Sequence, residues 1–102
     1  MMATAAGPQV SSSDGAPFTT AMSYGLCRQY VDELVLVDDD QIRTAMALIF
    51  RELKLAVEPA AAASTAALMT TLRERVRGMR VGIVICGTNI DFRRYAEHMG
   101  DA

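Results

Sequence analysis

Residues 81–91, VGIVICGTNID, constrain the fold of this chain more than any other stretch. The apolar run from Val81 lacks polar alternation, which favours a strand covered on both faces, as in a parallel α/β sheet. Gly82 has no side chain, so another backbone or helix can approach closely there. Ligands of open α/β sheets bind beyond the carboxyl ends of the strands. The candidate binding residues are therefore those that end the strand and form its turn: Cys86, Gly87, Thr88 and Asn89. The alternative is that this strand–turn–helix unit is only scaffold.

The composition is typical of a globular chain and too apolar for a disordered one. Of 102 residues, 51% are hydrophobic, and 12 acidic against 10 basic residues give a formal net charge of −2. This length suits one small domain or a piece of a larger one. The lack of a basic block argues against nucleic acid as a partner. No run approaches the roughly 20 apolar residues that cross a bilayer, and the start lacks a secretory signal, so we expect no membrane partner and a soluble, cytoplasmic protein.

The cysteines and the lysine limit the chemistry. Cys27 and Cys86 are too few and too far apart for a disulfide framework or a CxxC metal site, so reduced thiols are expected. Cys27 is interpreted as a packing thiol because no histidine accompanies it. Lys54 is the only lysine and falls inside a helical pattern. Reactions that need a suitably placed lysine therefore have one candidate here.

The first third of the chain predicts an arm, a helix and a strand. Residues 1–17 have the composition of a loop and are expected to form a flexible or extended arm. From residue 18, apolar residues recur every four positions, which predicts a short helix ending near residue 31. The apolar run at residues 34–37 is bounded by acidic residues and predicts a first buried strand.

Two helices are predicted next. Asp38 followed by Gln41 resembles a capping box for a helix over residues 39–54, which explains the triple aspartate more simply than a divalent metal does. Pro59 suits the first position of the following helix, whose pattern continues until Gly78. Glu58, just before that helix, is either a capping carboxylate or a cofactor-facing one.

A last helix is predicted after Asp91, with Phe92, Tyr95 and Met99 on one side. His98, near its end, is expected to be solvated or paired with the helix dipole rather than catalytic. The order of elements predicts an α/β fold with parallel strands, a partial three-layer αβα arrangement. Two strands cannot bury both faces of residues 81–86, so we expect part of a larger unit or a protomer that needs a partner.

Four blocks in this order resemble the C-terminal part of the catalytic domain of serine/threonine dehydratases, in the fold type II (tryptophan-synthase-β-like) class of pyridoxal-phosphate enzymes. They are YVDELVLVDDDQI, RTAMALIFRELKL, AVEPAAAASTAAL and VGIVICGTNID, and the similarity runs from about residue 13 to residue 91. The resemblance implies that residues 18–102 are a C-terminal piece of such a domain, incomplete as a fold type II domain.

The resemblance also implies roles for the candidate residues. Cys86 occupies the position that faces the pyridine nitrogen of pyridoxal 5'-phosphate, where a neutral group favours β-elimination. Gly87 would allow the backbone close to the ring. Thr88 and Asn89 would hold the turn, and Glu58 would lie near the cofactor side of the sheet.

Several features of the family have no counterpart in this sequence. Its Schiff-base lysine, substrate-carboxylate loop and glycine-rich phosphate loop lie upstream of the matching region, and Lys54 is no substitute. Alanine also replaces the glycine of the family's EPAG segment. We therefore expect a fragment of a lyase that converts L-serine or L-threonine to a 2-oxo acid and ammonia, inactive alone and unable to attach the cofactor covalently. The alternatives are a non-catalytic α/β module acting through self-association or a missing upstream domain, and a small thiol protein using Cys86. Racemisation in place of elimination stays open.

Overall fold

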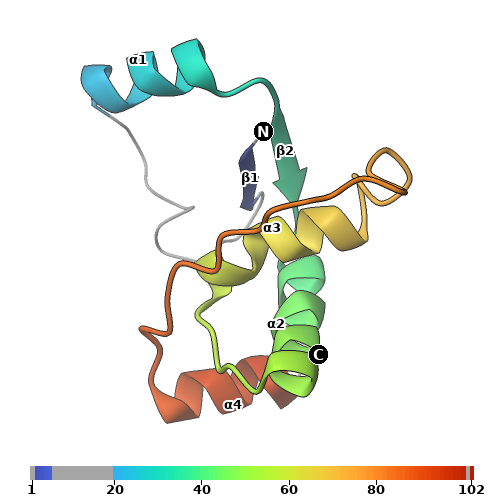
Figure 1. Cartoon of the computed structure of the whole chain (residues 1–102). Coiled ribbons are helices and arrows are strands. Elements are labelled where there is room, and N and C mark those ends of the chain that lie inside the picture. Colours follow the sequence, from blue (N-terminus) through green and yellow to red (C-terminus); the bar gives the residue numbers. More distant parts are fainter. Residues whose placement is uncertain (1, 6–19, 101) are drawn as a thin grey trace.

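The computed structural model describes residues 2–5, 20–100 and 102. In order along the chain, the elements are β1 (Met2–Ala5), α1 (Ala21–Tyr30), β2 (Leu34–Val37), α2 (Asp39–Leu53), α3 (Pro59–Met69) and α4 (Phe92–Gly100) (Figure 1). β1 and β2 pair in parallel, with Met2 opposite Leu34. Helices joined to parallel strands define the α/β class, as the sequence predicts. β1 lies within the stretch predicted as an arm, and the remainder of that arm, residues 6–17, lies outside the described residues.

β2 is confirmed at residues 34–37, but it buries only one of its faces. Val35 and Val37 are 4% and 2% exposed, whereas Leu34 and Leu36 are 56% and 58% exposed. Alternate side chains of a strand point to opposite faces, so the valine face joins the core and the leucine face is open. The sequence predicted a buried strand here, and the burial is correct for one face alone.

α2 forms the centre of the core and begins at the predicted capping box. Asp38 Oδ1 accepts a hydrogen bond from the Gln41 N–H at 2.8 Å, and Gln41 Oε1 accepts one from the Asp38 N–H at 2.9 Å. These two bonds satisfy donors that a helix start otherwise leaves free, which confirms the capping interpretation of Asp38. The buried face of α2 consists of Ile42, Ala45, Met46 and Ile49.

α3 packs its alanine-rich surface closely against α2 and the sheet, but it is shorter than predicted. The helix ends at Met69, whereas the sequence pattern predicted its continuation to Gly78. The Thr70 hydroxyl donates to the Ala66 carbonyl oxygen at 2.7 Å, a local bond that competes with helix geometry. Residues 70–79 form a series of turns, from which Leu72 enters the core and Val76 packs against it.

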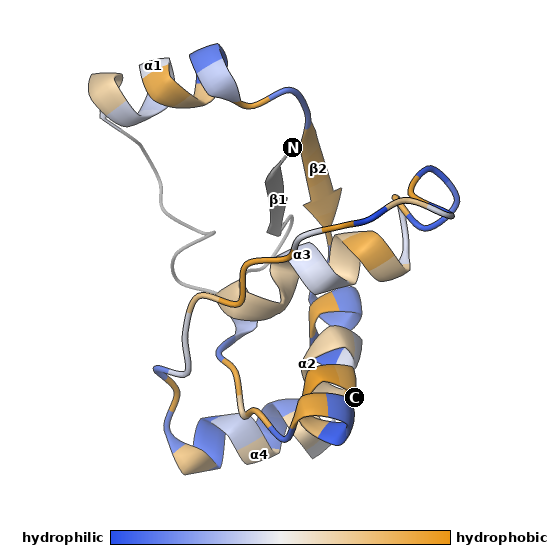
Figure 2. Ribbon diagram, viewed as in Figure 1, coloured by the Kyte–Doolittle hydropathy of each residue, from blue (hydrophilic) through white to orange (hydrophobic). Residues whose placement is uncertain are grey.

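Residues 81–86 are not a strand in this structure, which corrects the central prediction from the sequence. The segment, coloured as strongly apolar in Figure 2, runs across α3 in an extended course; Val81, Ile83 and Val84 are exposed, and Ile85 is partly buried against the core. A strand needs a neighbour to receive its backbone hydrogen bonds, and in the described part of the chain β2 pairs with β1 instead. No described atom lies within 4 Å of the place where a side chain at Gly82 would begin, so the expected close approach is also absent there.

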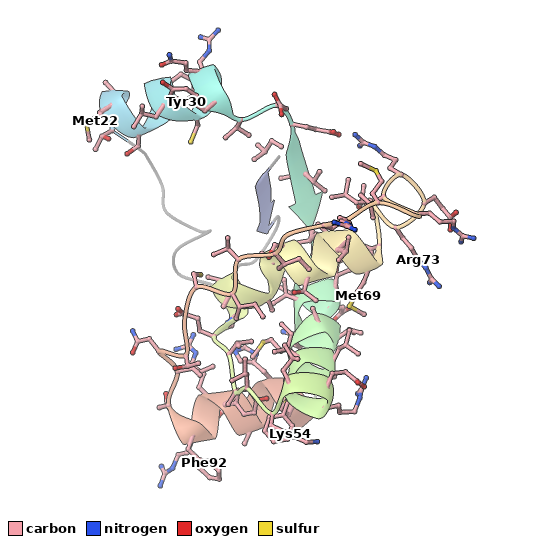
Figure 3. All side chains as sticks on the ribbon, viewed as in Figure 1. Met22, Tyr30, Lys54, Met69, Arg73 and Phe92 are labelled. Atoms are coloured by element: carbon pink, nitrogen blue, oxygen red, sulfur yellow. The ribbon has the colours of Figure 1, made fainter. Side chains whose placement is uncertain are left out.

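The two outer helices differ in how they pack. α1 buries none of its residues against the described part of the chain, and Met22 and Tyr30 project from it (Figure 3). α4 packs Tyr95 and Met99 against the core, but Phe92 is 85% exposed, so the predicted face is only partly correct. His98 is buried in the last turn of α4, not solvated.

Within the described ranges, no helix is both long and apolar enough to cross a membrane.

Candidate active site

Glu58 and Gly87, two of the predicted site residues, meet across the start of α3. The Glu58 N–H donates to the Gly87 carbonyl oxygen at 3.2 Å. A side-chain carbon built on Gly87 would lie 2.5 Å from Glu58 Oε1, which is too close for any real contact. A side chain at position 87 would therefore displace the Glu58 carboxylate, the end of a flexible side chain, from this place. The contact joins two segments that lie on either side of α3 in the sequence.

Glu58 is the residue before the first turn of α3, but its side chain makes no capping hydrogen bond. Pro59 at the first helical position has no N–H to be satisfied there. Of the two roles left open by the sequence, the capping one is therefore not adopted. The carboxylate lies instead beside the backbone of Gly87.

Cys86 and the turn after it are open to solvent. Cys86 carries a free thiol that is exposed, as are Thr88 and Asn89. The turn is closed by its backbone, since the Ile90 N–H donates to the Thr88 carbonyl oxygen at 2.8 Å, in a three-residue turn. The Thr88 and Asn89 side chains were expected to hold the turn, and that role is taken by the backbone here. Both amide and hydroxyl groups face outward and can reach a ligand.

α3 supports the segment that leads into the site. The Ser64 hydroxyl donates to the Val84 carbonyl oxygen at 3.3 Å, which ties residues 81–86 to the middle of α3. Together with the bond between Glu58 and Gly87, this fixes the segment at two points along one helix. The alanine side chains of α3 let the segment lie close, because a methyl group is the smallest side chain that a helix surface can carry there.

Lys54, the single lysine of the sequence, does not take part in this site. It follows the last residue of α2 in the left-handed conformation, with φ 58°, and its Nζ donates to the Arg51 carbonyl oxygen at 2.8 Å. Lysine near a helix C-terminus is stabilised by the helix dipole and by free carbonyl groups. Figure 3 places it at the far end of α2, next to α4. Its position is explained by helix termination.

A second polar region, which the sequence analysis did not identify, lies between α2 and α4. It is a hollow of about 450 Å³ lined by Arg43, Asp91, Arg93, Arg94, Glu97 and His98. The sequence signal that could have found it is the arginine pair Arg93–Arg94, which begins two residues after the helix-capping Asp91. The side chain of Arg43 comes from α2, and its approach to α4 depends on tertiary packing that no local pattern encodes.

The comparison with protein families identifies the class of this chain. The profile of the "Pyridoxal-phosphate dependent enzyme" family matches residues 3–87, which are most of the sequence. The chain therefore belongs to this family of pyridoxal-phosphate-dependent α/β enzymes, and the family resemblance seen in its sequence is confirmed. The matched range contains Glu58, Cys86 and Gly87 and ends before Thr88 and Asn89.

Individual relatives are amino-acid lyases and a racemase. The chain is 50% identical over 91 residues to a phenylserine dehydratase of Ralstonia pickettii, covering 89% of this chain and 28% of that protein. It is 37% identical over 70 residues to an L-threonine ammonia-lyase of Thermotoga maritima, covering 69% of this chain and 17% of that protein. It is 29% identical over 77 residues to a serine racemase of Schizosaccharomyces pombe, covering 76% of this chain and 24% of that protein. The chain thus spans less than a third of each relative's length.

Membership of the family implies dependence on pyridoxal phosphate, and the described residues fit one side of such a cofactor. The exposed Cys86 thiol offers a neutral polar group, and Gly87 gives a backbone without a side chain beside the Glu58 carboxylate. These groups suit the ring of a flat aromatic ligand. A cluster of cysteine, histidine or carboxylate ligands for a metal ion is absent from the residues that the structure describes.

Proposed function

We propose that this chain supplies the ring-side part of a pyridoxal-phosphate site in a lyase that acts on β-hydroxy-α-amino acids. The observation that carries the proposal is the contact between Glu58 and Gly87, directly beside the exposed Cys86. It brings together the two segments that the resemblance assigns to the same side of the cofactor. The names of the relatives, phenylserine dehydratase and L-threonine ammonia-lyase, support the reaction class.

When bound, pyridoxal phosphate supplies an electron-withdrawing ring that stabilises negative charge on the substrate. In our proposal Cys86 faces the ring nitrogen and, as a neutral group, does not hold a proton there. A carboxylate at this position would keep that nitrogen protonated through its charge. Gly87 lets the backbone lie against the ring, and Glu58 fixes that stretch of backbone. The substrate loses its α-proton and its β-hydroxyl group as water, and hydrolysis of the resulting 2-imino acid by a water molecule gives a 2-oxo acid and ammonia.

We further propose that residues 18–102 form part of a three-layer αβα domain and that this chain alone is inactive. Its single lysine lies at the end of α2, where Nζ donates to the Arg51 carbonyl oxygen. In the complete site, residues 81–86 would gain a strand neighbour, and a lysine from elsewhere would bind the cofactor and remove the α-proton. The amino-acid substrate is then a partner of the complete enzyme only.

A chimera tests this proposal directly. Residues 3–91 of this chain would replace the matching region of the Ralstonia pickettii phenylserine dehydratase, and 2-oxo acid formation from phenylserine, L-threonine and L-serine would be measured. We expect activity in the chimera and none from the isolated chain with added pyridoxal phosphate. Turnover by the isolated chain would contradict the proposed incompetence.

The role of Cys86 is tested in the same chimera by two substitutions of different charge. Cys86→Ser keeps a neutral group of similar size, so activity should stay within about tenfold. Cys86→Asp introduces a carboxylate beside the ring nitrogen, so activity should fall by at least about a further tenfold and the absorption band of the bound cofactor should shift. Equal activity and equal spectra in the two variants would remove Cys86 from the site.

A second candidate function is association with a partner chain without catalysis. It is favoured by apolar side chains that stay exposed on several elements: Met22, Leu34, Leu36 and Val84. Such surface promotes self-association or binding of a missing domain. Sedimentation of the isolated chain distinguishes the two states, because a monodisperse monomer at high concentration would count against this function.

A further inference from the structure

The polar hollow between α2 and α4 differs in chemistry from the proposed cofactor site at Cys86 and Gly87. Its lining is rich in charged groups, with three arginines drawn from two different elements. Arg43 stands on α2, whereas Arg93 and Arg94 stand in the first turn of α4. Guanidinium groups that converge from separate helices are brought together only by the fold. We propose that this hollow binds a phosphate group through Arg43, Arg93 and Arg94.

Arg43 is the most fixed of the three arginines. Its side chain is only 20% exposed, and its Nη1 donates to Asp40 Oδ1 at 2.9 Å. Its Nε is buried and has no hydrogen-bond acceptor among the described residues. A buried donor without an acceptor costs free energy, and an oxyanion in the hollow is an acceptor of the right charge. Arg43 therefore presents a rigid cation at the wall of the hollow.

Arg93 and Arg94 contribute guanidinium groups that no carboxylate of the described chain neutralises by an ion pair. The start of α4 is already capped, because Asp91 Oδ1 accepts a hydrogen bond from the Arg94 N–H at 3.1 Å. The backbone at the helix start is thus satisfied by the protein itself. Binding in the hollow would depend on the arginine side chains, whose forked geometry matches the oxygens of a phosphate group.

Two carboxylates in the lining set the limits of this site. Asp91 is held by the α4 backbone, while Glu97 stands three residues after Arg94 and four after Arg93, on the same helix face. Because Asp40 already pairs with Arg43, binding depends mainly on the guanidinium groups of Arg93 and Arg94, which have no ion pair among the described residues. Glu97 competes with an anion for the guanidinium groups, so removal of its charge should strengthen binding.

The phosphate group could be inorganic phosphate or belong to a small phosphate monoester, since both present the same oxygens. The site does not depend on the proposed lyase function. The family resemblance assigns the phosphate of the cofactor to a loop that has no counterpart in this sequence. Titration of the full chain with inorganic phosphate and with glycerol 3-phosphate distinguishes the two sources. The ligand that binds more tightly indicates which one the hollow prefers.

Calorimetric titration of the full chain in a buffer of low ionic strength tests the proposal. We expect saturable binding of one phosphate group per chain. The double variant Arg93→Gln/Arg94→Gln should bind at least about tenfold more weakly, and Arg94→Lys, which keeps the charge without the fork, should be weakened less. Glu97→Gln should bind several-fold more tightly, because it removes a like charge from the site.

Arg73→Gln is the matched control. Arg73 is also an exposed arginine, but it lies in the turns after α3, away from the hollow (Figure 3). Its substitution should leave phosphate binding unchanged. Circular dichroism of every variant checks that helix content is kept. If the double variant unfolds, the weaker phosphate binding expected of Arg94→Lys still tests the proposal. The proposal is overturned by a lack of saturable binding, by equal weakening in Arg73→Gln, or by Glu97→Gln binding no more tightly than the parent chain.

Discussion

The α2–α3 pair and residues 81–86 are both strongly apolar in sequence, yet they reach opposite ends of the burial scale. Met46 of α2 and Ala62 of α3 are 0% exposed, whereas Val81 and Val84 are 45% and 77% exposed. Each of the two helices covers the apolar face of the other within the chain. The segment has a helix on one side only, through the bond between Ser64 and Val84. An apolar sequence is thus a condition for burial, and a neighbouring surface decides whether burial occurs.

The same contrast divides the rest of the molecule. The valine face of β2 is buried, while its leucine face is exposed. α1 is held to the body by its connections and buries no residue among those described. The stability of the chain should therefore reside in α2, α3 and one face of β2. Substitutions of equal chemistry in the two regions should have very unequal effects.

The largest effect is expected from one substitution made in both regions. Val57, between α2 and α3, is 0% exposed, and Val84 is 77% exposed. Val57→Ala removes two buried methyl groups and leaves a cavity, so it should lower the free energy of unfolding by about 2 kcal/mol. Val84→Ala should change it by less than about 0.5 kcal/mol. Urea unfolding followed by circular dichroism measures both, and equal effects would show that residues 81–86 are packed in solution.

The next effect concerns the start of the stable region. Asp38→Ala removes the side-chain acceptor of the capping box and should destabilise the chain by about 1 kcal/mol. Asp38→Asn keeps an oxygen that can accept the Gln41 N–H, so most of the stability should return. Thermal melts compare the two variants. A loss as large in Asp38→Asn as in Asp38→Ala would assign the effect to charge rather than to the hydrogen bond.

Local signals predicted the stable region well. Each signal involves residues only a few positions apart in the sequence. The signals are the capping pair Asp38 and Gln41, the spacing of the apolar residues of α2, and the proline at the start of α3. Each of these features acts through short-range geometry. The boundaries of β2 followed from the acidic residues on both sides of it.

Long-range partners could not be predicted in the same way. The failure at residues 81–86 arose because a strand depends on a neighbour that no local pattern specifies. The end of α3 was missed because the Thr70 hydroxyl bonds back to the Ala66 carbonyl oxygen, a contact that the run of helix-forming residues does not reveal. For the site, the resemblance named Glu58 and Gly87 separately, whereas their mutual contact required the fold. The family itself was predicted from motif order, and the match over residues 3–87 confirms it.

A smaller effect is expected where α4 meets the stable region. Tyr95 packs its ring against Phe50, with 6.0 Å between ring centroids, and its buried hydroxyl has no hydrogen-bond partner among the described residues. Burial also raises the pKa of this hydroxyl. Tyr95→Phe keeps the ring contact and removes the unsatisfied group, so it should stabilise the chain by about 0.5 kcal/mol. Urea unfolding measures this change, and a loss of stability would reveal a partner for the hydroxyl in solution.

The smallest effect concerns the turns after α3, which pack Leu72 into the core and also form an ion pair with Glu33. Arg75 Nη1 donates to Glu33 Oε1 at 2.8 Å, and this hydrogen bond, helped by the charge of Arg75, lowers the pKa of the Glu33 carboxyl. Because the folded pKa lies below the unfolded one, the pair stabilises the chain above the ordinary glutamate pKa and loses this effect as the pH falls through the folded value. Both side chains are exposed, so the effect on stability should be slight.

An NMR titration of the Glu33 carboxyl carbon should give a midpoint below that of an unpaired glutamate, and Arg75→Gln should raise it. Arg77→Gln, which removes the separate pair with Glu74, should leave the Glu33 midpoint in place. If Arg75→Gln leaves the Glu33 midpoint unchanged, this ion pair does not hold the turns against the start of β2.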